Sequence, residues 1–172
     1  SFPTRRSSDW KSIKEELGDL FLHLVFYAKI GTEQEQFNLG GEKNRVNQIE
    51  GLHFFPPVKG IVSDGFNLAT SHPYVDIAAT ENSVVSAVLD GTVIMANWTD
   101  ETGFTIQIQH SNDLISIYKH NSKLLKRIGD KVNAGTAIAL VGSTGSLSTG
   151  YHLHFELWHK GVAIDPTKYI NF

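Results

Sequence analysis

The chain has 172 residues, and 15 Lys and Arg against 18 Asp and Glu give it a formal net charge of −3. A chain of this length can bury one hydrophobic core and carry a small additional segment. Because charges of both signs are spread along it, the chain lacks the clustered basic residues of a nucleic-acid-binding protein. The absence of cysteine excludes disulfides and thiol chemistry, but it does not select a cellular compartment.

The first part of the chain has the spacing of an amphipathic helix. Asp9 is a suitable N-cap, and apolar residues then recur every three or four positions as far as Ile30. The segment does not predict a membrane span, because four charged residues interrupt it: Lys14, Glu15, Glu16 and Asp19. The chain also shows no cleavage pattern of a signal peptide.

Residues 15–30 resemble the second half of the helical MazG type of nucleotide pyrophosphohydrolase, in the run EELGD followed by LFLHLVFYAKI. The resemblance implies that Glu16 and Asp19 bind magnesium together with carboxylates of an earlier helix, which is absent here. Half of such a site is not expected to act, since Mg²⁺ requires several oxygen ligands in octahedral geometry. We therefore expect residues 1–40 to be a helical extension, non-native or truncated, and residues 41–55 to be a linker.

The remainder of the chain, residues 56–172, has the pattern of a mainly β domain. Apolar runs of strand length recur at short, regular intervals. Turn residues separate them at Asp90-Gly91, Thr102-Gly103, Gly129-Asp130 and Gly145. This spacing predicts an antiparallel β-sandwich or half-barrel, preceded by the N-terminal α-helical segment. We expect three loops to form the walls of a groove, at residues 64–73, 97–103 and 142–151.

The first candidate metal-binding motif is His72-Pro-Tyr-Val-Asp76. Pro73 removes a backbone donor and disfavours helix, so His72 and Asp76 are not a helical pair. A loop that carries His72 into a strand beginning at Val75 would let both side chains meet on one ion. Two histidines and an aspartate with one open position suit catalytic zinc, whereas a closed structural site needs four protein ligands, usually with thiolates.

The second motif, Tyr118-Lys-His120, ends an alternating run over residues 114–120. In a strand, Ser116, Tyr118 and His120 share one face, opposite two isoleucines. We therefore expect His120 to leave the strand on the same side as Tyr118 and to act in proton transfer.

The third motif, His152-Leu-His154, lies in residues 151–158, where polarity alternates with a period of two. Both imidazoles therefore point to the same side as Glu156 and Trp158. Side chains two positions apart on a strand are separated by roughly 6–7 Å, so one imidazole can bind a metal while the other reaches the water that the metal activates. Three residues on the other side are expected in the core: Leu153, Phe155 and Leu157.

Together these motifs resemble the lysostaphin and LytM type of zinc metalloendopeptidase, which cuts peptide cross-links in bacterial peptidoglycan. The family pattern is His-x-x-x-Asp, Tyr-x-His and His-x-His followed by Phe, and residues 56–172 contain all three in that order. The resemblance implies a duplicated hybrid-motif fold and one zinc ion. It also implies the roles of five residues: His72, Asp76 and His154 as zinc ligands, and His120 and His152 as the catalytic pair.

The chain departs from the family pattern beside the first histidine, where glycine is usual and Pro73 and Tyr74 stand. A tyrosine at this place can crowd the metal or alter the backbone. Asn67 and Tyr118 are further candidates for contact with the substrate, Asn67 because related enzymes carry Arg or Asn near the substrate in this region. The remaining histidines are expected to be structural: His23, His53, His110 and His159.

The sequence therefore predicts a zinc endopeptidase that hydrolyses peptidoglycan cross-links with metal-activated water. Either His120 or His152 can be the general base, and the other would stabilise the oxyanion or protonate the leaving amine. A catalytically silent cell-wall-binding or hydrolase-regulating domain is the first alternative, and a nucleotide pyrophosphohydrolase is the distant second. The expected partners are peptidoglycan peptides, and the resemblance implies a location in the cell envelope or outside the cell.

Overall fold

The computed structural model describes residue 49 and residues 51–172. The predicted helix over residues 9–30 and the expected extension over residues 1–40, with Glu16, Asp19 and His23, lie outside this part and stay predictions. Within the described part, no helix is both long enough and apolar enough to cross a membrane.

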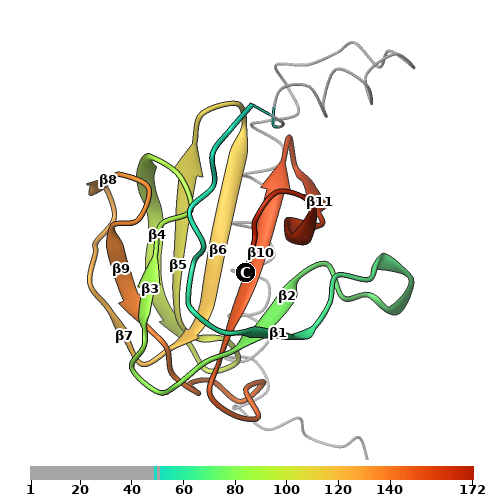
Figure 1. The fold of residues 1–172 in the computed structure, drawn as a ribbon. Helices are drawn as coiled ribbons and strands as arrows, with labels where there is room; N and C mark the ends of the chain where they lie inside the picture. The colour runs from blue at the N-terminus through green and yellow to red at the C-terminus, as the bar shows by residue number, and fades with distance from the viewer. Residues whose placement is uncertain (1–48, 50) are drawn as a thin grey trace, which may run out of the picture. The chain divides into compact units, whose positions relative to one another are not determined.

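The larger of two sheets has eight strands, and all of their pairings are antiparallel (Figure 1). Its strand order is β1 (Ile61–Asp64), β2 (Val75–Ala78), β10 (His152–His159), β6 (Leu114–Asn121), β5 (Gly103–His110), β4 (Gly91–Thr99) and β8 (Lys131–Val132). The eighth strand, β11 (Val162–Ile164), pairs with the end of β10. Two short 3₁₀ helices accompany the sheet: η1 (Leu68–Thr70) and η2 (Pro166–Lys168).

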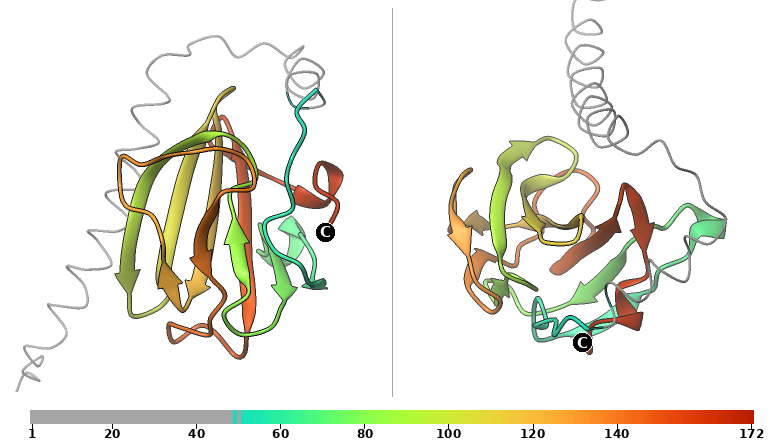
Figure 2. Two further views of the ribbon diagram at one scale, coloured as in Figure 1. Left: turned by 60° about the vertical axis from the view of Figure 1, so that its left-hand side comes forward. Right: turned by 90° about the horizontal axis from the view of Figure 1, so that it is seen from above.

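The smaller sheet has three strands, in the order β3 (Val84–Ser86), β9 (Ala137–Leu140) and β7 (Lys123–Leu124). The strands of the larger sheet curve around it, which the view from above in Figure 2 shows most clearly. This arrangement confirms the predicted mainly β, antiparallel sandwich or half-barrel. The prediction succeeds because it depends on neighbours along the chain: the alternating apolar runs form strands, and the predicted turn residues separate them.

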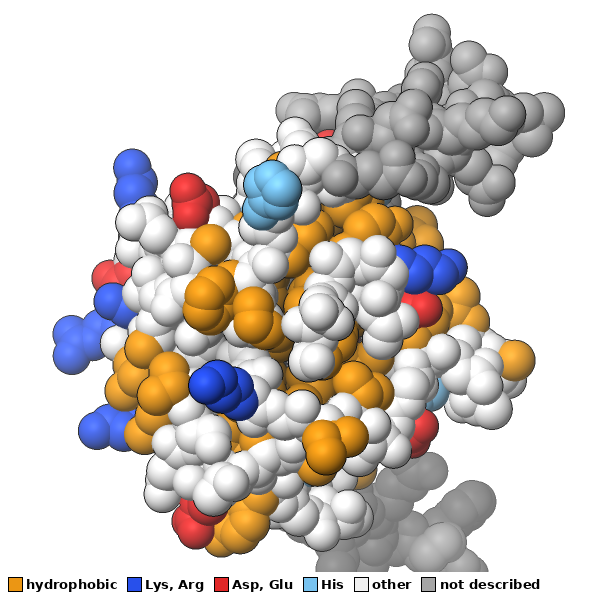
Figure 3. Space-filling model, viewed as in Figure 1, with side chains coloured by type: hydrophobic (Ala, Val, Ile, Leu, Met, Phe, Trp, Pro, Cys, Tyr) orange, Lys and Arg blue, Asp and Glu red, His pale blue; other side chains and the backbone are white. Residues whose placement is uncertain are grey.

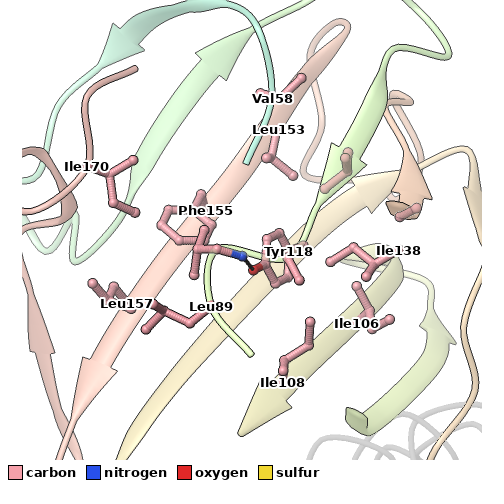
Figure 4. Packing of buried hydrophobic residues seen from close by; sticks show 14 of the residues in the cluster. Val58, Leu89, Ile106, Ile108, Tyr118, Ile138, Leu153, Phe155, Leu157 and Ile170 are labelled. Carbon is pink, nitrogen blue, oxygen red and sulfur yellow. Dashed lines mark hydrogen bonds between the residues drawn. The ribbon is translucent and has the colours of Figure 1, made fainter. Parts of the chain in front are cut away.

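The core fills the space between the two sheets (Figure 4). The side chains of Leu153, Phe155 and Leu157 are all fully buried, as the alternation in β10 predicts. The ring of Tyr118 lies beside that of Phe155, with centroids 5.2 Å apart, and the Tyr118 hydroxyl accepts a hydrogen bond from the backbone N–H of Val88 at 3.1 Å. Burying these large side chains supplies the main favourable free energy of folding for such a domain.

A bulge at the end of β6 changes the direction of His120. In the pairing with β5, the register shifts between Phe104 and Ile106, and β6 has one extra residue opposite this step. His120 has a φ of 63°, in the left-handed region. Its ring therefore lies near the two site histidines of β10, whereas the Tyr118 ring packs in the core. The prediction that His120 and Tyr118 leave β6 on the same side is wrong, because strict alternation does not continue through a bulge.

Cationic side chains gather along one edge of the face in Figure 3, over the strands of the smaller sheet and β8. Lys123 in β7 and Lys131 in β8 are exposed, and Lys126 and Arg127 lie between them in the sequence. The same segment exposes Ile128. The segment from β7 to β8 is therefore a basic, partly apolar border of the domain.

Candidate metal centre

The pairing of β2 with β10 places an aspartate opposite a histidine. In this antiparallel ladder, Asp76 lies opposite His154 and Ala78 lies opposite His152. Side chains directly opposite each other in such a ladder start from Cβ atoms about 4.5–5.5 Å apart, so they meet. The two histidines of β10 share one side of the strand, as the sequence predicts, because both approach the same carboxylate.

The loop between β1 and β2 brings His72 to this pair. Asn67 and His72 exchange two backbone hydrogen bonds, of 2.8 and 2.9 Å, which close the loop on itself. The Asn67 side chain caps η1, where its oxygen accepts a hydrogen bond from the backbone N–H of Ala69. Asn67 therefore shapes the loop that carries His72. Its predicted contact with a substrate stays a prediction.

Both expected histidine ligands approach the Asp76 carboxylate. His154 Nδ1 lies 3.4 Å from Asp76 Oδ1, and His72 Nε2 lies 3.9 Å from Asp76 Oδ2. For comparison, zinc bonds of about 2.0–2.1 Å in a tetrahedral site place neighbouring ligand atoms roughly 3.4 Å apart. Asp76 Oδ1 is buried and has no hydrogen-bond partner, although buried carboxylate oxygens normally have one.

The charge state of Asp76 suits a cation. Burial raises the pKa of Asp76, but the neighbouring imidazoles of His154, His152 and His72 outweigh burial and lower the pKa overall. The side chain is therefore a carboxylate at neutral pH, which is the form that binds a metal.

Hydrogen bonds determine which nitrogen of each imidazole is free. In His72, His120 and His152, Nδ1–H donates to a backbone carbonyl, which leaves the lone pair on Nε2. The accepting carbonyls are those of Tyr74, Thr144 and Gly150, at 3.1, 2.9 and 2.8 Å respectively. His154 has the opposite arrangement, since its Nε2–H donates to Glu156 Oε1 at 3.0 Å and its Nδ1 faces the carboxylate of β2.

His120 and His152 lie beside the same centre. Their ring centroids are 5.1 Å apart, and His152 Nε2 is 3.9 Å from Asp76 Oδ1. Two loops hold His120, because its backbone N–H donates to the carbonyl of Thr102 and its carbonyl accepts from the N–H of Thr144. Burial, assisted by the neighbouring histidines, lowers the pKa of His120 to about 4. At neutral pH His120 is therefore uncharged and can accept a proton at Nε2.

The ring of Tyr74 lies between two of the expected zinc ligands. Its centroid is 3.7 Å from that of His72 and 3.8 Å from that of His154. As the side chains stand, no group of three or more His, Cys, Asp or Glu residues in the described part of the chain is arranged to hold a metal ion. The donor types and the unpartnered oxygen of Asp76 fit zinc, and the Tyr74 ring packs against both imidazoles.

Tyr118 is not brought to this centre. It is fully buried, and its hydroxyl is hydrogen-bonded to the hydroxyl of Ser116 at 2.9 Å as well as to the backbone of Val88. Ser116 Oγ in turn lies 2.7 Å from Nε2 of His110, whose Nδ1–H donates to the carbonyl of Asp90 at 2.9 Å. Both nitrogens of this buried histidine are therefore used inside the domain, as expected for a structural residue.

Two residues beside the centre were not predicted from the sequence. Asp64 Oδ2 lies 3.2 Å from His72 Nε2, because the pairing of β1 with β2 places Asp64 opposite Asp76. Lys119 forms an ion pair with Glu156, because the pairing of β6 with β10 places Lys119 opposite His154. Both placements depend on strand pairing between distant segments, so no local pattern could have found them.

The sequence matches two protein families. Peptidase family M23 matches residues 70–166. The MazG nucleotide pyrophosphohydrolase domain matches residues 5–46, which lie outside the part that the structure describes. Among individual proteins, the murein hydrolase activator NlpD of Escherichia coli (strain K12) is 37% identical over 116 residues. The match covers 66% of this chain and 30% of that activator, so the chain spans less than a third of this relative.

Solved structures with a similar fold include two peptidases. A zinc-containing peptidase from Vibrio cholerae is 30% identical, with a TM-score of 0.61, and the match covers 66% of this chain and 39% of that one. The catalytic domain of the antimicrobial peptidase lysostaphin from Staphylococcus simulans is 29% identical, with a TM-score of 0.53. That match covers 73% of this chain and 94% of the lysostaphin domain.

Proposed function

Because this chain belongs to peptidase family M23, we propose that it is a zinc-dependent endopeptidase that hydrolyses the peptide cross-links of bacterial peptidoglycan, in the cell envelope or outside the cell. One observation carries the proposal. His72 Nε2 and His154 Nδ1 face the carboxylate of Asp76, and two further imidazoles lie beside them. The likeness to a zinc-containing peptidase and to lysostaphin supports zinc as the metal.

Three side chains would hold the zinc ion: His72 through Nε2, Asp76 through its carboxylate and His154 through Nδ1. A bound zinc ion supplies Lewis acidity, which lowers the pKa of water and polarises a carbonyl group. Three protein ligands leave one position for water or substrate, as a catalytic zinc site requires.

His120 and His152 would carry the proton transfers. In each ring the Nδ1–H bond to a carbonyl fixes the orientation and leaves Nε2 free to take a proton from water. Since the pKa of His120 is lowered to about 4, this side chain is neutral before the reaction and readily gives up a proton that it has taken. The geometry supports either histidine as the base, with the other donating a hydrogen bond to the oxyanion or to the leaving amine.

The test is hydrolysis of purified peptidoglycan by the zinc-loaded protein, followed by turbidity and by the masses of the released peptides. We expect His154→Ala to lose both zinc binding and hydrolysis, because it removes a ligand. His152→Ala should retain zinc and lose turnover by on the order of 100-fold or more, the usual effect of removing one donor to a transition state. The masses identify the bond that is cut.

The matched control is His53→Ala, which replaces an exposed histidine in the segment before β1 and should hydrolyse like the unaltered protein. If the unaltered protein binds one zinc ion and releases no peptide under these conditions, the proposed activity is wrong.

A hydrolase-regulating domain is the second candidate, and two observations favour it. The similar Escherichia coli protein is named an activator of murein hydrolases, and the ring of Tyr74 stands between His72 and His154. In that case the unaltered protein and His154→Ala should both release no peptide, and both should stimulate a murein hydrolase to the same extent.

A further inference from the structure

We propose that Glu156 is a positioning residue that sets the tautomer and the orientation of His154, so that Nδ1 of this ring is available to a metal. The inference rests on the proposed zinc site and assigns a role to a carboxylate outside the five-residue motif.

Glu156 is held from three directions. Its Oε1 accepts hydrogen bonds from His154 Nε2, at 3.0 Å, and from the ammonium group of Lys119. Its Oε2 accepts a hydrogen bond from Trp158 Nε1 at 2.6 Å. The carboxylate is buried, with only 6% of the residue exposed, so these three donors replace water around it. Because three donors fix the position of the Glu156 carboxylate, this carboxylate can in turn fix the orientation of the His154 ring.

Strand geometry explains why these four residues meet. His154, Glu156 and Trp158 are alternate residues of β10 and therefore share one side of the strand. Lys119 lies opposite His154 in the neighbouring strand β6. The assembly sits on regular strands rather than on a loop, which gives a more rigid support for a binding residue.

The contrast with the other histidines of the site supports the assignment. In His72, His120 and His152, Nδ1 is the nitrogen that is hydrogen-bonded to a backbone carbonyl. His154 differs from them, because its Nε2 is hydrogen-bonded to Glu156 and its Nδ1 is the nitrogen that lies 3.4 Å from Asp76. Without Glu156, nothing described around the ring would select the tautomer with the proton on Nε2, and the lone pair needed at Nδ1 would be lost in part of the population.

The experiment compares the unaltered protein with Glu156→Gln, both as the whole chain. Two properties are measured: the zinc affinity, and which ring nitrogen of His154 carries the proton. Zinc affinity is measured by competition with a chromogenic chelator. The ring tautomer is read from long-range proton–nitrogen NMR correlations in metal-free protein. We expect zinc binding to weaken by roughly 10- to 100-fold, the usual effect of removing the carboxylate behind a ligating histidine. We also expect the Nδ1–H tautomer of His154 to appear.

Trp158→Phe keeps the carboxylate and removes one of its three donors, so it should weaken zinc binding less than Glu156→Gln does. If Glu156→Gln does not fold, Trp158→Phe is compared with the unaltered protein, and zinc binding as tight as that of the unaltered protein contradicts the proposal. Glu101→Gln, which changes an exposed carboxylate in a loop, is the matched control and should bind zinc like the unaltered protein. The proposal is wrong if Glu156→Gln binds zinc within about twofold of the unaltered protein and His154 keeps the proton on Nε2.

The two readouts separate this inference from the proposed enzyme activity. If the unaltered protein binds zinc but cleaves no peptidoglycan, the activity fails while the affinity comparison still tests Glu156. If the unaltered protein binds no zinc, the tautomer in metal-free protein decides whether Glu156 orients His154.

Discussion

Tyr74 is an aromatic residue at the expected metal centre. Its ring packs against His72 and His154 at the same time, with centroid distances of 3.7 and 3.8 Å. Each aromatic contact of this kind is worth about 0.5–1.5 kcal/mol. Zinc binding that displaces this ring would therefore cost part of this free energy, because a protein whose binding-competent conformation is only partly populated has an apparent affinity reduced by that populated fraction.

We expect Tyr74→Ala to bind zinc about tenfold more tightly than the unaltered protein, which corresponds to about 1.4 kcal/mol. The reason is that the ring no longer has to leave the space between the two imidazoles. Equilibrium competition with a chelator measures the affinity, and Tyr74→Phe, which keeps the ring, should bind like the unaltered protein. Weaker or unchanged binding by Tyr74→Ala would contradict this account.

At the scale of elements, two loops at the end of the larger sheet act together to hold His120. The backbone N–H of Ser146 donates to the carbonyl of Asp100, and the N–H of Leu147 donates to that of Glu101, so the loop before β5 and the loop before β10 are joined. Gly145 lies at this junction with a φ of 86°, and a Cβ atom there would collide with the backbone of Glu101 and Gly103. Only glycine fits such a position without strain.

Gly145→Ala should therefore lower the free energy of unfolding by about 1–3 kcal/mol, the usual cost of one strained backbone position. Chemical denaturation measures this change. Gly150→Ala in the same loop is the control, because a Cβ atom at Gly150 meets nothing within 4 Å, and it should be close to neutral. Equal stability of the two variants would show that the junction does not constrain the loops.

At the scale of the whole molecule, buried neutral histidines link stability to pH. Burial lowers the pKa of His110, although the carbonyl of Asp90 opposes this shift, and burial lowers the pKa of His120 to about 4. Below about pH 6.5, the ordinary pKa of histidine, the unfolded chain takes up protons that these folded imidazoles do not accept. The free energy of unfolding should therefore fall as the pH decreases from 6.5 toward the folded pKa values.

We expect His110→Gln to show a smaller loss of stability between pH 7.5 and pH 5.0 than the unaltered protein, because one of the responsible groups is gone. Urea unfolding at both pH values, with a chelator present to keep the protein metal-free, measures this difference. His53→Gln, a change at an exposed position, should retain the full pH dependence. A loss in His110→Gln as large as that in the unaltered protein would rule out His110 as a cause.

The sequence by itself determined the features that depend on neighbours along the chain. Alternation over residues 151–158 placed His152 and His154 on one side of a strand and buried Phe155 on the other, since successive side chains of a strand point to opposite faces. Turn residues such as Gly103 and Gly145, both with positive φ, separated the strands of the antiparallel domain. The residue types of the three motifs were sufficient to indicate the family and the expected zinc ligands.

Only the tertiary structure decided which side chains face one another across strands. Asp76 meets His154, and Lys119 meets Glu156, through the register of strands that are far apart in sequence. The bulge that turns His120 away from Tyr118 is a property of the β5–β6 pairing, and the place of the Tyr74 ring depends on how the β1–β2 loop closes. Periodicity fixes the side of a strand on which a residue lies, whereas register and loop closure depend on the packing of the entire domain.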